Sequence, residues 1–210
     1  MRCTNENIFQ EEVKKKLRMK KHRILFLYLT VLVSILCSCG KLETYSELPS
    51  VEFVSVYLAD TVDALGNDVK LQNLNLEVID GDGNLGLNSE DTINSFAPDS
   101  EYYNNLFIRL FQKTNGNYIE LEQLSKNLKY RVPYKAPIGQ NKYLKAEVKI
   151  KIEIPLGYFD YDTVRYEIFV YDRDLNKSEI ATSCDIPAHG HGTVFANGEC
   201  SFFQDEEEDN

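Results

Sequence analysis

The segment from Lys142 to Ile154 alternates polar and apolar residues with a strict period of two. The apolar positions are Ala146, Val148, Ile150, Ile152 and Ile154, and the charged positions are Lys145, Glu147, Lys149, Lys151 and Glu153. Because successive side chains of a strand point to opposite faces, this pattern predicts a long β-strand with one buried face and one wet face. Strands of this kind are typical of antiparallel sheets.

Other segments rich in β-branched and aromatic residues predict further strands. They span Val51–Tyr57, Val69–Ile79, Leu106–Gln112, Tyr118–Leu121, Thr163–Tyr171 and Glu179–Ile186. The pair Asn115-Gly116 is typical of a type I′ hairpin turn. We find no clear amphipathic helical pattern after Cys39. The sequence therefore predicts an all-β fold, an immunoglobulin-like or fibronectin-III-like antiparallel β-sandwich.

The N-terminus contains a basic stretch, residues 20–23, followed by an apolar run from Ile24 to Leu36. As a helix this run would be roughly 20 Å long, which is too short for a membrane core of about 30 Å. Its length is that of the apolar part of a signal peptide. The run ends in Leu36-Cys37-Ser38-Cys39, which resembles the lipobox of bacterial lipoproteins and implies a lipid on Cys39. The alternative is a plain cleaved signal peptide.

Charge divides the chain at this point. The net charge is -10 overall, but residues 39–210 contain 15 basic and 30 acidic residues. Because such a surface repels phosphate, nucleic-acid binding is disfavoured. We expect a leader and lipoprotein signal peptide over residues 1–38, with Met19 as a candidate true start. The predicted order then continues with a lipidated tether over 39–50, a β-sandwich over 51–186, and a C-terminal appendage with a solvated acidic tail over 187–210.

An acidic loop follows the strand that ends near Ile79. Oxygen donors occupy its positions 1, 3, 5 and 12, namely Asp80, Asp82, Asn84 and Asp91. This spacing suits calcium, although Leu85 replaces the glycine that an EF-hand has at position 6. One interpretation is a calcium site of another geometry that shares Asp172 or Asp174 if the loops cluster. The other is tight turns, which also favour Asp and Gly.

Cys184 and Cys200 are the two cysteines after Cys39. In an exported protein they would form a disulfide around a loop of about 16 residues, worth roughly 3 kcal/mol in the chain-entropy model. Two free thiols are the alternative. A zinc or copper site that adds His189 and His191 to these cysteines is a further alternative.

Two motifs resemble those of a group of small Bacteroidota lipoproteins. They are Asp80-Gly81-Asp82-Gly83-Asn84-Leu85-Gly86 and Tyr171-Asp172-Arg173-Asp174-Leu175-Asn176-Lys177-Ser178, and they occur here together with the lipobox. The resemblance covers roughly residues 39–186 and implies a lipid-anchored immunoglobulin-like sandwich at the outer membrane, on its periplasmic or cell-surface face. The group itself has no settled activity.

From these features we expect a non-enzymatic binding or structural lipoprotein that contacts the membrane through its lipid and binds an envelope protein or a glycan. The many tyrosines are numerous enough to build such a binding platform. Alternatives are a glycan hydrolase, for which Asp160 and Asp162 are a candidate carboxylate pair, an accessory module of such a hydrolase, or a calcium-stabilised adhesion module. Donor-strand exchange into fibres is a third possibility.

Overall fold

The computed structural model describes residues 16–23, 26–27, 44–136, 142–158, 162–196 and 201–203. The chain divides into two compact units, Met1–Glu43 and Thr44–Asn210. Residues 16–23 and 26–27 of the first unit are helical, and no described helix is long and apolar enough to cross a membrane. Both sheets and the buried core lie in the second unit, which therefore contains what it needs to fold by itself.

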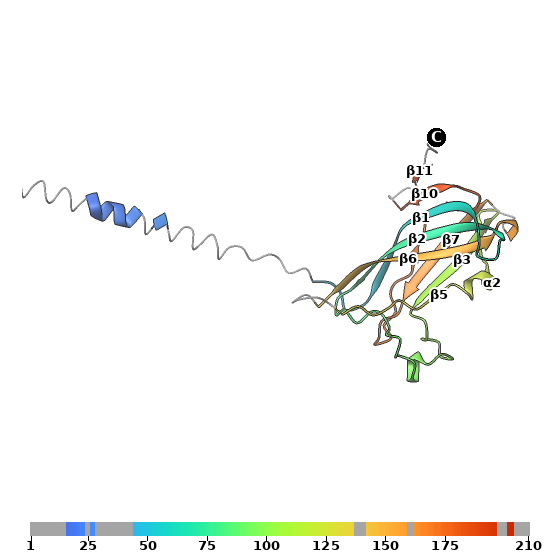
Figure 1. Cartoon of the computed structure of the whole chain (residues 1–210), viewed down its shortest axis with the longest axis horizontal. Helices are drawn as coiled ribbons and strands as arrows, with labels where there is room; N and C mark the ends of the chain where they lie inside the picture. The colour runs from blue at the N-terminus through green and yellow to red at the C-terminus, as the bar shows by residue number, and fades with distance from the viewer. Residues whose placement is uncertain are drawn as a thin grey trace, which may run out of the picture. The chain divides into compact units, whose positions relative to one another are not determined.

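The second unit is built mainly from antiparallel strands, with only short helical turns among its described residues (Figure 1). The strands are β1 (Ser50–Val62), β2 (Asp68–Asp80), β3 (Leu106–Thr114), β4 (Asn117–Glu120), β5 (Lys129–Tyr130), β6 (Leu144–Pro155), β7 (Thr163–Val170), β8 (Ala181–Thr182), β9 (Ile186–Pro187), β10 (Gly192–Phe195) and β11 (Ser201–Phe203). Short helical turns are η1 (Asn94–Phe96), α2 (Glu122–Ser125) and η2 (Leu156–Tyr158).

The strands form two sheets. The first has the order β11-β10-β1-β2-β6, and the second has the order β4-β3-β7-β8, with β5 paired to β3 and β9 paired to β7. Figure 1 shows β1, β2 and β6 in one layer and β3 and β7 in the other, with the β2–β3 connection projecting from one end of the strands. The predicted all-β sandwich is thereby confirmed.

Strand β6 has the predicted alternation. Ile150, Ile152 and Ile154 are buried, whereas Lys149 and Lys151 are exposed. Burying each isoleucine side chain contributes on the order of 2 kcal/mol, so the period-two pattern decides which face of β6 packs on the core. The inward residues of β2 and β7 complete that core between the sheets.

The predicted hairpin turn is confirmed, because Asn115 and Gly116 both have positive φ, at 52° and 82°. The predicted strand over Glu179–Ile186 is instead two short strands, β8 and β9, that both pair with β7. Between them the Ser183 hydroxyl accepts a hydrogen bond from the Tyr166 backbone amide at 2.8 Å. This hydroxyl takes the place of a carbonyl in the ladder, which interrupts the regular pairing.

Part of the segment that we assigned to an appendage belongs to the first sheet. Strand β10 pairs with β1 from Ser55↔Phe195 to Leu58↔Gly192, and β11 pairs with β10. Val194 is buried in the core. The backbone amides and carbonyls on the free edge of β1 require hydrogen-bond partners, and β10 provides them. Residues 192–195 also alternate buried and partly exposed side chains, as a strand at that position must.

Candidate functional site

Two buried carboxylates, Asp80 and Asp172, mark one end of the sandwich. Asp80 is the last residue of β2 and continues the inward parity of Leu76 and Val78. Asp172 lies two residues beyond β7 and continues the inward parity of Val170. Their side chains are 0% and 1% exposed. The period-two pattern of two strands from different sheets therefore places both carboxylates inside the fold.

Asp80 is only half satisfied by hydrogen bonds. Its Oδ2 accepts the Leu85 backbone amide at 2.6 Å, whereas its Oδ1 is buried and has no donor. The pKa of the Asp80 carboxyl is raised to about 6, chiefly by burial. The negative charges of Asp82 and Asp172 also act to raise this pKa, whereas the Leu85 and Asn84 backbone amides act to lower it. Asp80 thus lies in an electronegative environment that disfavours its ionised form.

Asn84 connects the two loops at this end of the sandwich. Its Nδ2 donates to Asp82 Oδ2 at 2.8 Å and to Asp174 Oδ2 at 2.9 Å. The Asn84 Oδ1 is buried and accepts no hydrogen bond. Nearby, Asp172 accepts from the backbone and side-chain amides of Asn176, each at 2.8 Å. The loop after β2 and the loop after β7 therefore form one acidic cluster, made of Asp80, Asp82, Asn84, Asp172 and Asp174.

Asp91, the fourth residue of the predicted calcium loop, has other partners. Its Oδ2 accepts the Asn88 amide at 2.7 Å and pairs with the Arg173 guanidinium. The Asn88 amide holds the pKa of Asp91 below its usual value, and Arg173 lowers it further despite the opposing effect of burial. Arg131 donates to the Asp91 carbonyl. Three of the four residues of the predicted calcium loop, Asp80, Asp82 and Asn84, thus lie with Asp172 and Asp174. The fourth, Asp91, forms an ion pair with Arg173 instead.

Within the described part of the chain, no group of three or more His, Cys, Asp or Glu side chains is arranged to hold a metal ion. The calcium site therefore stays a prediction.

A second feature is an aromatic cluster on the outer face of the second sheet. Phe107 of β3 and Phe169 of β7 are cross-strand partners, and their rings stack 5.2 Å apart at 7°. Tyr171 meets both rings edge-on, at 5.7 and 5.9 Å. Tyr102 packs on Tyr171 in the same T-shaped manner at 5.1 Å. Such pairs add to the free energy gained by burying the rings.

Phe107, Phe169 and Tyr171 of this cluster line a hollow of about 410 Å³, which we call the aromatic hollow. Residues 98–101, 103 and 104 of the β2–β3 connection form its other side. They bring Asp99, Ser100, Glu101 and Asn104 to it, and Lys129 of β5 adds a cation. A volume of this size is in the range of small-ligand sites, and such sites combine apolar walls with a few polar groups.

The sequence predicts a binding platform from its many tyrosines, which include Tyr102 and Tyr171, but this prediction missed Phe107 and Phe169. The signal was present in the sequence, because both phenylalanines lie on the outward parity of their strands, where a solvated face would have polar residues. Nothing in the local pattern of either strand shows that the two rings would face each other.

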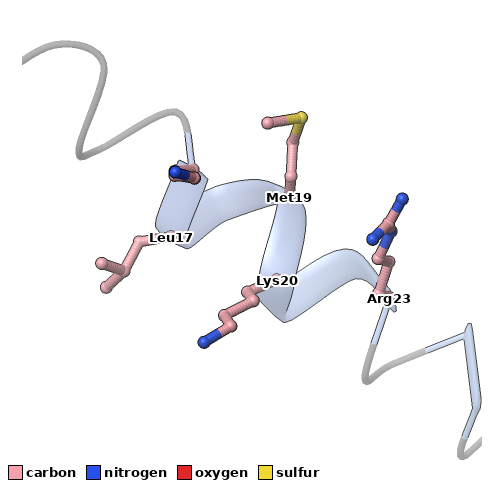
Figure 2. Close-up of a pocket in the computed structure, with 5 residues that line it drawn as sticks. Leu17, Met19, Lys20 and Arg23 are labelled. Atoms are coloured by element: carbon pink, nitrogen blue, oxygen red, sulfur yellow. The ribbon is translucent and has the colours of Figure 1, made fainter.

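A larger hollow of about 550 Å³ lies along residues 16–23. Figure 2 shows that Leu17, Met19, Lys20 and Arg23 leave one helical segment in different directions. Its described lining residues all come from this single segment. We assign no site to it.

The remaining predicted site residues lie at other places. Cys184 is disulfide-bonded, and its predicted partner Cys200 lies outside the described residues, as does Cys39. His191 Nε2 lies 3.0 Å from Asp60 Oδ2.

Of the carboxylate pair proposed for hydrolysis, Asp160 also lies outside the described residues, and the Asp162 carbonyl accepts the Ala188 amide at 2.8 Å. The structure therefore gives no geometry for that pair.

Comparison of the chain with protein-family models, curated proteins and solved structures finds no match.

Proposed function

We propose that this chain is a non-enzymatic binding protein of the cell envelope, anchored by a lipid on Cys39, and that its ligand is a glycan. The observation that carries the proposal is the aromatic hollow, with Phe107, Phe169 and Tyr171 on one side and polar residues on the other. A sugar ring has the same division, because its C–H faces are apolar and its hydroxyl groups form hydrogen bonds.

The chemistry of the aromatic hollow suits such a ligand. Aromatic rings provide a flat apolar surface against which the C–H face of a sugar packs. Asp99 and Glu101 accept hydrogen bonds from hydroxyl groups, and Asn104 both donates and accepts them. Because the chain has a net charge of -10, an approaching anionic glycan is repelled. We therefore expect a neutral glycan.

The proposal is tested with residues 44–210 on an array of neutral and acidic oligosaccharides, followed by calorimetric titration of the oligosaccharide that binds best. The exposed-loop substitutions Asp99→Asn and Glu101→Gln should weaken binding, because they remove charged acceptors and leave the sheets intact. The matched control is Tyr57→Ala, which removes a 37% exposed tyrosine from β1 of the other sheet. Binding that Tyr57→Ala abolishes and the loop variants leave unchanged would refute the assignment of the hollow.

A second candidate, a glycan hydrolase, is favoured by one observation, which is that Asp99 and Glu101 both line the hollow. Glycoside hydrolysis needs two carboxylates on opposite sides of the scissile bond. The same oligosaccharides are incubated with the protein and the products are separated by chromatography. Turnover that disappears in both loop variants would favour the hydrolase, and binding without turnover favours the binding protein.

The lipid anchor is tested independently of the ligand. The full chain is expressed in a bacterial host with a radiolabelled fatty acid, and the mature N-terminus is identified by mass spectrometry. We expect an acylated Cys39 as the first residue, and an unprocessed, unlabelled precursor for Cys39→Ala. Cleavage of the wild type at another bond without label would identify a plain signal peptide instead.

A further inference from the structure

The acidic cluster contains four carboxylates without a basic partner. Among the described residues, none of Asp80, Asp82, Asp172 and Asp174 forms an ion pair with a lysine or an arginine. Arg173 lies between two of them in the sequence, but its guanidinium pairs with Asp91 and lies 4.7 Å from the Tyr134 ring centroid. Negative charge therefore accumulates at this end of the sandwich.

An independent observation points to what is missing. Asp80 is fully buried, its Oδ2 is used by the Leu85 amide, and its Oδ1 has no donor. The buried Asn84 Oδ1 also has no donor. An unpaired buried carboxylate oxygen is costly, and a cation removes that cost by contacting it directly. Two unsatisfied oxygens thus belong to residues of the acidic cluster.

We propose that the acidic cluster is a divalent-cation site with Asp80, Asp82, Asn84, Asp172 and Asp174 as its oxygen donors, and that it takes calcium. Asp91 is not a donor. The inference does not depend on the glycan proposal, because the aromatic hollow uses other residues.

The side chain of Asn84 explains why the carboxylates are not arranged around a metal ion as they stand. Its Nδ2 donates to Asp82 and Asp174 at 2.8 and 2.9 Å, so the amide hydrogens lie between the two carboxylates, where a cation would otherwise bind. Turning the amide by 180° replaces this donor with Oδ1, which is an acceptor. A cation that displaces the Nδ2 group would then contact oxygens from Asn84 and both carboxylates.

The donor set determines which cation fits. All five side chains offer oxygen, and none offers nitrogen or sulfur to the ion. Oxygen donors suit hard cations, and calcium takes six to eight of them in irregular geometry, whereas magnesium demands a regular octahedron and keeps several waters. Donors from two separate loops favour the irregular geometry. Calcium should therefore bind more tightly than magnesium.

The test is thermal unfolding of residues 44–210, first stripped with EDTA and then titrated with calcium chloride. At a free calcium concentration 100 times the dissociation constant, we expect the Tm to rise by on the order of 5 °C. Magnesium at the same concentration should give a smaller rise. A calcium concentration of 10 mM is about ten times the weakest dissociation constant of extracellular calcium sites. No change in Tm up to that concentration would therefore overturn the proposal.

Charge-removing variants identify the donors. Asp82→Asn and Asp174→Asn keep an acceptor for Asn84 Nδ2 but lose a charge, and each should lose most of the calcium-induced rise in Tm. The matched control is Asp63→Asn, in the turn at the opposite end of β2, where Asp63 accepts the Leu65 and Asn67 amides at 2.8 and 2.9 Å. This control should keep the full rise.

Asp91→Asn separates the two possible donor sets. If the site is the one proposed here, this variant keeps the calcium response. If it loses the response while Asp174→Asn keeps it, the donors are instead spaced at positions 1, 3, 5 and 12 of one loop, and our assignment of Asp172 and Asp174 is refuted.

Discussion

Replacing Asp80 with asparagine should stabilise the metal-free protein near neutral pH. The pKa of the Asp80 carboxyl is about 6 in the folded protein, against a reference of 3.8. A difference of about 2 pH units corresponds to about 3 kcal/mol, at 1.36 kcal/mol for each unit. Asp80 is fully buried, so solvent does not screen this effect. Asparagine keeps an oxygen for the Leu85 amide and carries no charge.

The direction of the pH dependence follows from linkage. Between about pH 4 and pH 6 the folded protein holds the Asp80 proton and the unfolded chain has released it. Stability from this group is therefore lost as the pH rises through that window, and the loss is complete above about pH 7. At pH 7 Asp80→Asn should be more stable than the wild type by up to about 3 kcal/mol, and at pH 4 the two should be nearly equal.

The assay is urea unfolding followed by circular dichroism, in EDTA, at half-unit steps from pH 4 to pH 7.5. Asp60, Asp91 and Asp185 have lowered pKa values and contribute the opposite slope, so the difference between variant and wild type is the informative quantity. A difference that does not change with pH would refute the reasoning, as would a variant that is less stable at pH 7.

Three further predictions concern stability, measured by urea unfolding at pH 7. Tyr166→Phe removes the buried hydroxyl that donates to Gln72 Oε1, and we expect a loss of about 1–3 kcal/mol. Gly86→Ala puts a Cβ 2.6 Å from a backbone atom at a φ of +104°, so it should cost at least about 1 kcal/mol more than Gly66→Ala, where φ is +86° and space is open. Cys184→Ser breaks a disulfide and should lower the free energy of unfolding by about 2–4 kcal/mol. For each of these variants, an unchanged free energy of unfolding would contradict the cause given for it.

The strands of the sandwich were largely predictable from local sequence. The alternation around Ile150 and Ile152 decides which face of β6 is buried, and the Asn115-Gly116 pair decides the following hairpin. Both signals are local, because side-chain direction and turn conformation depend on a few neighbouring residues. The prediction was wrong for the continuous strand over Glu179–Ile186, because a serine hydroxyl interrupts the ladder and this depends on a distant partner.

The candidate sites show the same division. The inward position of Asp80 follows from the parity that it shares with Leu76 and Val78, and that of Asp172 follows from Val170. Each of these facts is contained in one strand. Neither strand by itself shows that the two carboxylates belong to one cluster, because that requires the ends of β2 and β7 to meet across the two sheets.

The sequence by itself therefore determined the element type, the buried face of each long strand and the chemical nature of the loops. Only the tertiary structure decided which loops meet, because contacts such as Asn84 with Asp174 join residues 90 positions apart. Such contacts arise when hydrophobic burial brings two sheets together, and this driving force has no direction. Sheet pairing and the core then select which residues become neighbours. For this reason Asp91 pairs with Arg173, and Asp172 and Asp174 join the acidic cluster in its place.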